Sequence, residues 1–240
     1  MRYSREETIK NFDEASKDIK RLYQKGCINR KGKTNDTDEY YTEIFSEQLL
    51  HMKVGELEEN ISQINRPNYK VGSHSKTVSK NNTNRREENF AKSMLWSEIE
   101  KLGEIIDFQI PLKKPGANAA INKGVGKIDL ISFNKGKPSA YIIELKDNQN
   151  KETLLRAILE IFTYYCQLNK GNFIDSFEEY TDNCLEPENI KKAVLLGKDS
   201  LGAIEANELK NRLKLKKLIK VLGVEIFEYD FKVENITLWN

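Results

Sequence analysis

The sequence predicts an α/β domain preceded by a helical extension. From residue 87 onward, segments with helical periodicity alternate with short apolar runs that Gly and Pro interrupt, a pattern typical of a sheet covered by helices. Residues 1–64 instead show helical spacing throughout, and residues 65–86 contain no acid. We therefore divide the chain into a helical extension (1–64), a basic linker or arm (65–86) and an α/β domain (87–240).

The composition restricts the chemistry more than it restricts the fold. The chain of 240 residues carries 39 Lys and Arg against 37 acids, so any basic surface must come from local segregation of charge. Its three cysteines are widely spaced and offer neither a zinc motif nor a disulfide framework. Only two histidines are present, which argues against His-based triads and leaves chemistry by acids and lysine.

The N-terminal segment has no apolar signal core, and no apolar run approaches the ~20 residues of a membrane span. We therefore expect a soluble, cytoplasmic protein with no membrane partner.

In the extension, apolar residues recur with the spacing of one helix up to Gly26 and of a second over residues 36–52. A shorter helical piece follows within residues 54–64. These amphipathic helices are expected to form a homodimer or to recognise a substrate.

The basic stretch 65–86 is open to two compatible interpretations. Its polar turn-forming residues are typical of a solvated linker. Its unopposed charge, with Arg85 and Arg86 at the end, would also suit a mobile arm that binds phosphates.

The α/β domain is predicted element by element from periodicity and turn signals. Residues 87–103 form a helix that ends at Gly103, and residues 104–112 form a strand that ends near Pro111. Strands 127–133 and 140–146 flank a turn rich in Gly and Pro, and so form an antiparallel hairpin. The remaining elements are a helix over 151–168, a strand over 191–197, a helix over 201–223 and a closing strand over 224–231.

Charged residues interrupt the apolar strands at one end of this hairpin. Side chains alternate along a strand, so Glu144 and Lys146 point the same way, roughly 6–7 Å apart. The neighbouring strand can bring Asp129 beside Glu144. Burying such groups unpaired is costly, and a hard cation such as Mg²⁺, which takes a few carboxylate oxygens and keeps waters that meet a phosphate, would compensate them.

The segments GKIDLI (126–131) and IIELK (142–146) together resemble the PD-(D/E)XK nuclease superfamily, which has the restriction-endonuclease-like fold. The resemblance spans residues 87–230 and implies an α-β-β-β-α-β core with a mixed central sheet. It makes Asp129, Glu144 and Lys146 the catalytic residues. It also implies metal ligation by Asp129, Glu144 and the Leu145 carbonyl, with Mg²⁺ as cofactor and Mn²⁺ as a substitute.

The family pattern suggests three further positions. A glutamate from the preceding helix often joins the metal site; Glu87 and Glu88 are the candidates, with a slight preference for Glu88. Many relatives carry a Gln-x-x-x-Tyr pair on the next helix, where this chain has Glu160 and Tyr164, so the role of position 160 departs from the pattern. The proline that names the motif is replaced by Ile128.

The resemblance implies hydrolysis of phosphodiester bonds by an endonuclease, with DNA the expected substrate rather than RNA because most relatives act on DNA. Besides the two arginines, three lysines of the 113–126 loop are candidate phosphate contacts: Lys113, Lys114 and Lys123. The alternative is a nucleic-acid-binding or assembly protein that keeps the fold without catalysis.

Overall fold

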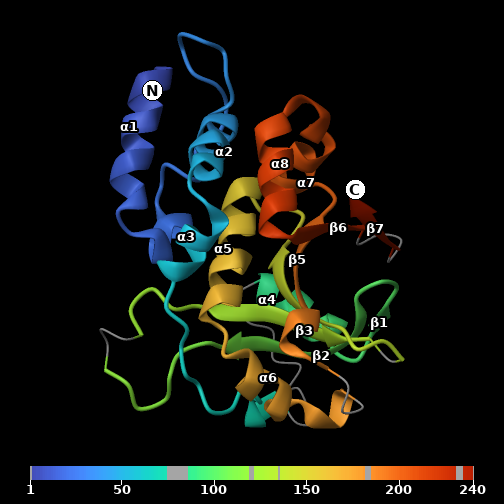
Figure 1. The fold of residues 1–240 in the computed structure, drawn as a ribbon. Coiled ribbons are helices and arrows are strands. Elements are labelled where there is room, and N and C mark those ends of the chain that lie inside the picture. Colours follow the sequence, from blue (N-terminus) through green and yellow to red (C-terminus); the bar gives the residue numbers. More distant parts are fainter. Residues whose placement is uncertain are drawn as a thin grey trace.

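The computed structural model describes residues 2–74, 86–118, 122–134, 136–181, 185–230 and 235–239. A seven-stranded sheet with its strands in sequence order runs through the molecule (Figure 1). The strands are β1 (Glu98–Ile99), β2 (Gly103–Pro111), β3 (Lys127–Phe133), β4 (Ala140–Lys146), β5 (Ile190–Gly197), β6 (Val224–Asp230) and β7 (Asn235–Trp239).

The sheet is mixed. Strands β1 to β4 are antiparallel neighbours, β4, β5 and β6 run parallel, and β7 returns antiparallel to β6. The predicted hairpin of residues 127–146 is confirmed, with Leu130 opposite Ile143 and Phe133 opposite Ala140. The predicted α/β class with a mixed sheet is therefore confirmed.

Helices cover both faces of the sheet (Figure 1). Their bounds are α1 (Arg5–Ser16), α2 (Tyr41–His51), α3 (Val54–Glu59), α4 (Arg86–Met94), α5 (Leu154–Gln167), α6 (Lys170–Ser176), α7 (Leu201–Asn207) and α8 (Leu213–Leu222). Short 3₁₀ segments are η1 (Ile19–Gln24), η2 (Gly72–His74), η3 (Glu178–Tyr180), η4 (Pro187–Asn189) and η5 (Leu209–Asn211). Among the described residues, no helix has the length and apolarity of a membrane-spanning segment.

Side chains alternate between the two faces of the sheet, and each face packs into its own hydrophobic core. Ile128 and Ile142 face the core that α5 and α8 cover. Leu130 and Ile143 face the smaller core under α4. Helix α5 is apolar enough to be buried along most of its length because it lies between the sheet and the N-terminal helices.

Helix α4 is shorter than the predicted helix over 87–103. It ends at Met94, after which Trp96 adopts a left-handed φ of 67° and its amide donates to the Ile105 carbonyl. Residues 98–103 then form the short hairpin of β1 and β2. Gly103 is needed at the turn because its φ is 87° and a Cβ there would collide with the Phe133 carbonyl.

The predicted helix over 201–223 is interrupted. Arg212 leaves the helical region, with φ −124° and ψ 64°, and α8 begins after it. The amides of Lys214 and Leu215, at the start of α8, donate to the Glu43 carboxylate of α2. An acid from the extension thus satisfies the N-terminus of a helix far along the chain.

The extension is packed into the α/β domain. Ile44 and Phe45 lie on the predicted apolar stripe of α2, and other parts of this chain bury both side chains completely. Helix α2 lies beside α8 (Figure 1). The face from which we expected a homodimer is therefore already covered.

Tyr69 anchors the start of the basic stretch to the domain, whereas Asn65, Pro67, Asn68 and Lys70 around it are exposed, as expected of a linker. Tyr69 is fully buried and packs edge-on against Phe173, and its hydroxyl oxygen accepts a hydrogen bond from the Asn169 amide. The Tyr69 amide donates to the Ser176 hydroxyl. Residues 75–85 lie outside the described residues.

The buried guanidinium of Arg212 links the extension to the domain. It donates to the Thr42 hydroxyl at 2.8 Å and pairs with Glu205 and Glu208 at 3.3 and 2.7 Å. Replacing Arg212 with Ala leaves the Glu205 carboxylate buried without its cation. We expect this change to lower the free energy of unfolding by about 3–5 kcal/mol in urea denaturation.

A double variant, Arg212→Leu with Glu205→Leu, removes both charges and should lose less stability than Arg212→Ala alone. Lys17→Ala, which breaks an exposed ion pair with Glu14, is the control and should leave the denaturation midpoint unchanged. A loss for Arg212→Ala no larger than that of the control would contradict the assigned role.

Candidate active site

The charged residues predicted at the hairpin lie in an open cleft of about 530 Å³ where β2, β3 and β4 meet α4 and α5. The cleft is lined by Arg86, Glu87, Glu88, Gln109, Asp129, Glu144, Lys146, Asp147 and Glu160. The structure therefore brings together Asp129, Glu144 and Lys146, as the sequence spacing predicted.

The hairpin changes character where these residues begin. The paired residues of β3 and β4 stop at Leu130 and Ile143. One step further, the Leu145 amide donates to the Asp129 carboxylate at 2.9 Å. Here the side-chain carboxylate of Asp129, rather than a backbone carbonyl of β3, accepts the hydrogen bond from β4. This contact holds the Asp129 carboxylate at the end of β4. Leu145 itself is buried under α4.

The ammonium of Lys146 is surrounded by carboxylates. Its Nζ lies 2.7 Å from Glu144, 2.8 Å from Glu152 and 3.3 Å from Glu160. Burial opposes its charge, but the neighbouring carboxylates outweigh burial and raise the Lys146 pKa well above its ordinary value. Lys146 is therefore a permanent cation near neutral pH, and its proton is not easily lost.

The pKa values of the two central acids are raised as well, which favours their neutral forms. Burial raises the pKa of Asp129 to about 7, against the lowering effect of Lys146 and the Leu145 amide. Burial, reinforced by Asp129 and Glu160, also raises the pKa of Glu144 well above its ordinary value. One oxygen of Glu144 accepts from Lys146, whereas the other, Oε2, is buried and has no hydrogen-bond partner.

Glu160 and Tyr164 also reach the site. The Tyr164 hydroxyl donates to Glu160 at 2.8 Å, and Glu160 pairs with Lys146. Gly126 leaves room for this hydroxyl, since a Cβ at position 126 would collide with it. Position 160, where the family pattern has glutamine, is thus a buried acid that helps hold the lysine.

The N-terminal extension packs behind Glu160 and Tyr164. The Tyr23 ring packs edge-on against Tyr164, with the two hydroxyls 3.4 Å apart. The Gln24 amide donates to the Gly124 carbonyl at 3.2 Å. Segment η1 therefore braces the loop that leads into β3.

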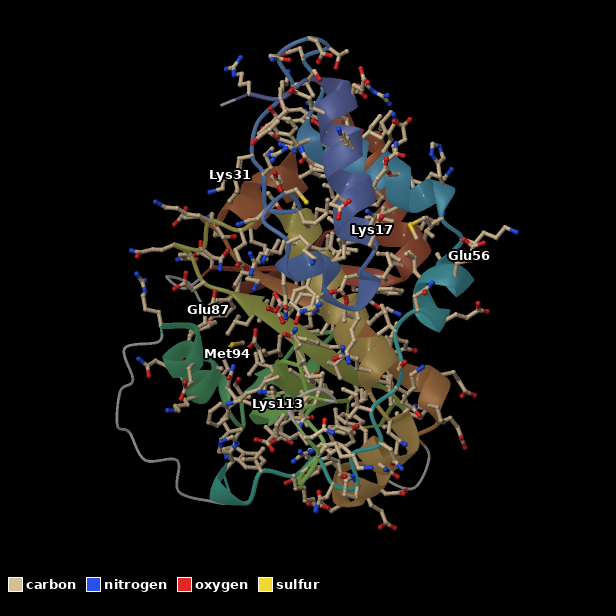
Figure 2. The ribbon with its side chains drawn as sticks, turned by 90° about the vertical axis from the view of Figure 1, so that its left-hand side faces the viewer. Lys17, Lys31, Glu56, Glu87, Met94 and Lys113 are labelled. Carbon is tan, nitrogen blue, oxygen red and sulfur yellow. The ribbon has the colours of Figure 1, made fainter. Side chains whose placement is uncertain are left out.

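Helix α4 presents its first turn to the cleft. Figure 2 shows Glu87 and Met94 on this helix, with Glu87 at its N-terminal end. Glu87 accepts from the Asn150 side chain at 2.8 Å and adds to the raised pKa of Asp129, whereas Glu88 pairs with Lys92 on its own helix. These contacts favour Glu87 over Glu88 as the acid that acts on the centre.

Three contributors were missed by the sequence analysis. Gln109 on β2 donates its amide to Asp129 at 2.7 Å from a backbone φ of 51°, unusual for a residue that is not glycine. Glu152 and Asp147 lie just after β4, and Asp147 pairs with Arg86 at 3.3 Å. The run of acids and amides in DNQNKE (147–152) is the signal in the sequence that could have indicated the latter two; Gln109 has none.

Only one of the described residues predicted to contact phosphate lies in the cleft. Arg86 lines the cleft, while Lys113, Lys114 and Lys123 are exposed on the loop between β2 and β3. Asn122 closes this loop through hydrogen bonds to both the amide and the carbonyl of Lys114. Figure 2 shows Lys113 where β2 leads into that loop. Arg85 lies outside the described residues.

Within the described residues, no group of three or more His, Cys, Asp or Glu side chains is gathered in a metal-binding arrangement. Lys146 contacts Glu144, Glu152 and Glu160. Glu144 Oε2 has no hydrogen-bond partner, whereas the two Asp129 oxygens accept from Gln109 and from the Leu145 amide.

Comparison with known proteins adds no relative: no family model, no curated protein and no solved structure matches this chain.

The raised pKa of Asp129 makes stability depend on pH. Its pKa is about 7 in the folded chain and about 3.9 when unfolded, so the folded state binds the proton more tightly. The resulting stabilisation is complete below about pH 4 and is lost as the pH rises through about 7. In the presence of a chelator, we expect Asp129→Asn to remove up to about 4 kcal/mol of this pH dependence.

Urea denaturation between pH 4.5 and 8 measures the effect as the difference between wild type and Asp129→Asn. Because the cleft is open to water, the figure is an upper bound. Parallel stability profiles for the two proteins would contradict a proton held at Asp129.

Proposed function

We propose that this chain is a metal-dependent nuclease with a restriction-endonuclease-like fold that hydrolyses phosphodiester bonds, DNA being the substrate class favoured by the resemblance. The observation that carries the proposal is the convergence of Asp129, Glu144 and Lys146 in one cleft at the end of the β3–β4 hairpin. The order α4, β2, β3, β4, α5, β5 along the chain supports it, because it is the order of elements that the resemblance implies.

The donor set fits a hard divalent cation. Mg²⁺ is commonly held by one or two carboxylates and completes its shell with water and substrate phosphate, so a group of three protein ligands is not required. Glu144 Oε2 is a buried acceptor with no partner, and the pKa values of Asp129 and Glu144 are raised even beside the Lys146 ammonium, so a further cation would favour their ionised forms. Asp129 and Glu144 would hold the ion, with Glu87 at the rim.

When bound, such an ion supplies Lewis-acid stabilisation of the charge that develops on a phosphate and lowers the pKa of water. The chain's own residues supply position and charge. Gln109 and the Leu145 amide orient the Asp129 carboxylate. Glu152 and Glu160 hold the Lys146 ammonium at the cleft.

The charge state of Lys146 favours one of the roles that the sequence left open. A lysine whose pKa lies well above its ordinary value is a poor base for removing a proton from water. It is well suited to bind a non-bridging phosphate oxygen and to stabilise the negative charge that grows there. We therefore assign Lys146 the electrostatic role.

Exchanging Lys146 for Ala should reduce cleavage of duplex or single-stranded DNA about 100-fold or more, the usual cost of losing one preorganised donor to the transition state. Cleavage should be followed in Mg²⁺, in Mn²⁺ and in EDTA, and should disappear in EDTA. RNA is the comparison substrate.

The matched control is Lys191→Ala. Lys191 lies on the neighbouring strand β5 opposite Tyr141, at the other end of β4 from the cleft, and its loss should leave the rate unchanged. Cleavage by Lys146→Ala at the wild-type rate would refute the assigned site. Binding of DNA without cleavage by wild type would favour the alternative, a nucleic-acid-binding protein that keeps the fold.

Metal binding can be tested without any substrate. Mn²⁺ or Mg²⁺ at about ten times its dissociation constant should raise the melting temperature of wild type by about 3 °C or more. Glu144→Gln and Asp129→Asn should each lose most of this shift. Glu225→Gln, on β6, should keep it, and equal shifts in all four proteins would place the ion elsewhere.

A further inference from the structure

A second pocket, of about 300 Å³, opens at the outer part of β2, between the packed segment 70–74 and η3. Among the described residues it shares no lining residue with the acidic cleft, and its lining combines aromatic rings with charged and aliphatic residues. The lining includes His74, Trp96, Ile106, Asp107, Phe177 and Tyr180. Nothing in the proposed hydrolysis uses these residues.

Two aromatic rings stand at the mouth. Trp96 is 48% exposed, and its ring centroid lies 6.4 Å from that of Tyr180, with 33° between the ring planes. Both rings line the same pocket, so a base that enters it meets an aromatic face on which it can stack.

The backbone holds Trp96 in this position at a cost. Its φ of 67° is unusual for a bulky residue, and its amide is fixed to the Ile105 carbonyl. Such strain concentrates at binding and catalytic sites. A large apolar ring is thus held 48% exposed by a turn that is tied to β2.

The floor of the pocket offers polar groups in fixed positions. His74 stacks on Phe108 with centroids 4.0 Å apart, and its Nδ1 lies 2.7 Å from Asp107. Asp107 also accepts the Phe108 amide. With Nδ1 turned toward Asp107, Nε2 is the ring nitrogen left to meet the edge of a ligand.

The charged side chains of the pocket have partners. Lys70 pairs with Glu179 at 2.6 Å across the rim, and the Asp107 carboxylate on the floor lies 2.7 Å from Nδ1 of the His74 ring. A phosphate would find no excess of positive charge there. A flat, uncharged ring with polar edges fits the lining better.

We propose that this pocket binds a single unstacked nucleobase of the nucleic-acid chain, with the base stacked on Trp96 and Tyr180 and its edge toward His74. The inference rests on the proposed function for its choice of ligand. Strand β2 joins the two sites, since Asp107 lies two residues before Gln109, which orients Asp129. Capture of a base would therefore set which phosphate of the strand enters the acidic cleft.

The test is a binding measurement in EDTA, where no cleavage is expected. A fluorescein-labelled single strand of twelve thymidines is titrated with wild type, Trp96→Ala, Tyr180→Leu and Trp96→Phe, and anisotropy is recorded. Loss of a stacking ring should raise the dissociation constant about five-fold or more, whereas Trp96→Phe should recover most of the affinity. Leu213→Ala removes another exposed apolar side chain, on α8, and should have no effect.

An abasic strand of the same length and charge separates stacking from electrostatics. Wild type and Trp96→Ala should bind the abasic strand equally. A Trp239→Phe background leaves Trp96 as the sole tryptophan of the chain, and its fluorescence should be quenched by the thymidine strand only. Melting temperatures confirm that each variant is folded.

Equal binding of the thymidine strand by wild type and both ring variants would overturn the proposal, as would an equal loss on the abasic strand or no binding by wild type. If the chain cleaves DNA but Trp96 has no effect on binding, the pocket fails and the nuclease stands. If stacking is found without cleavage, the nuclease fails and the pocket stands.

Discussion

The arrangement of the candidate active site depends on the ammonium of Lys146 at the end of β4. Three carboxylates approach this one cation, and they come from β4, from the turn after it and from α5. Without the lysine, these acids would repel one another in a partly desolvated space, which would favour opening of the sheet end. The same clustering lines the cleft with more acids than bases, a setting that suits the divalent cation of the proposed function.

Much of the fold could be predicted from local pattern. Alternation in residues 140–146 placed Glu144 and Lys146 on one face, and the Gly- and Pro-rich turn indicated the hairpin that brings Asp129 to them. These features are encoded by neighbours in the chain. For the same reason the helix over 151–168 and the strands over 191–197 and 224–231 lie where the apolar periodicity predicted them.

Features that depend on distant partners were missed. The interruption at Arg212 is set by Thr42 and Glu205, and the end of α4 is set by pairing of Trp96 with Ile105. The role of Gln109 follows from the pairing of β2 with β3, which brings its side chain to Asp129. Tyr69 was read as part of a solvated stretch because nothing in its vicinity along the chain is apolar enough to suggest the cavity against Phe173 that it fills.

The packing of α2 against α8 also bears on the order of folding during synthesis. Helix α2 emerges early from the ribosome, but the residues that cover its apolar stripe and use Glu43 as a cap are some 170 positions later. Long-range contacts of this kind slow folding, because the intervening chain must be closed before they form. Helix α1 can cover part of α2 early, since Phe12 packs against Phe45, but the part that lies against α8 stays uncovered until nearly the whole chain has been translated. Tyr23 and Gln24, which brace the wall of the cleft, belong to the same N-terminal segment, so its docking links the cleft to the C-terminal helices.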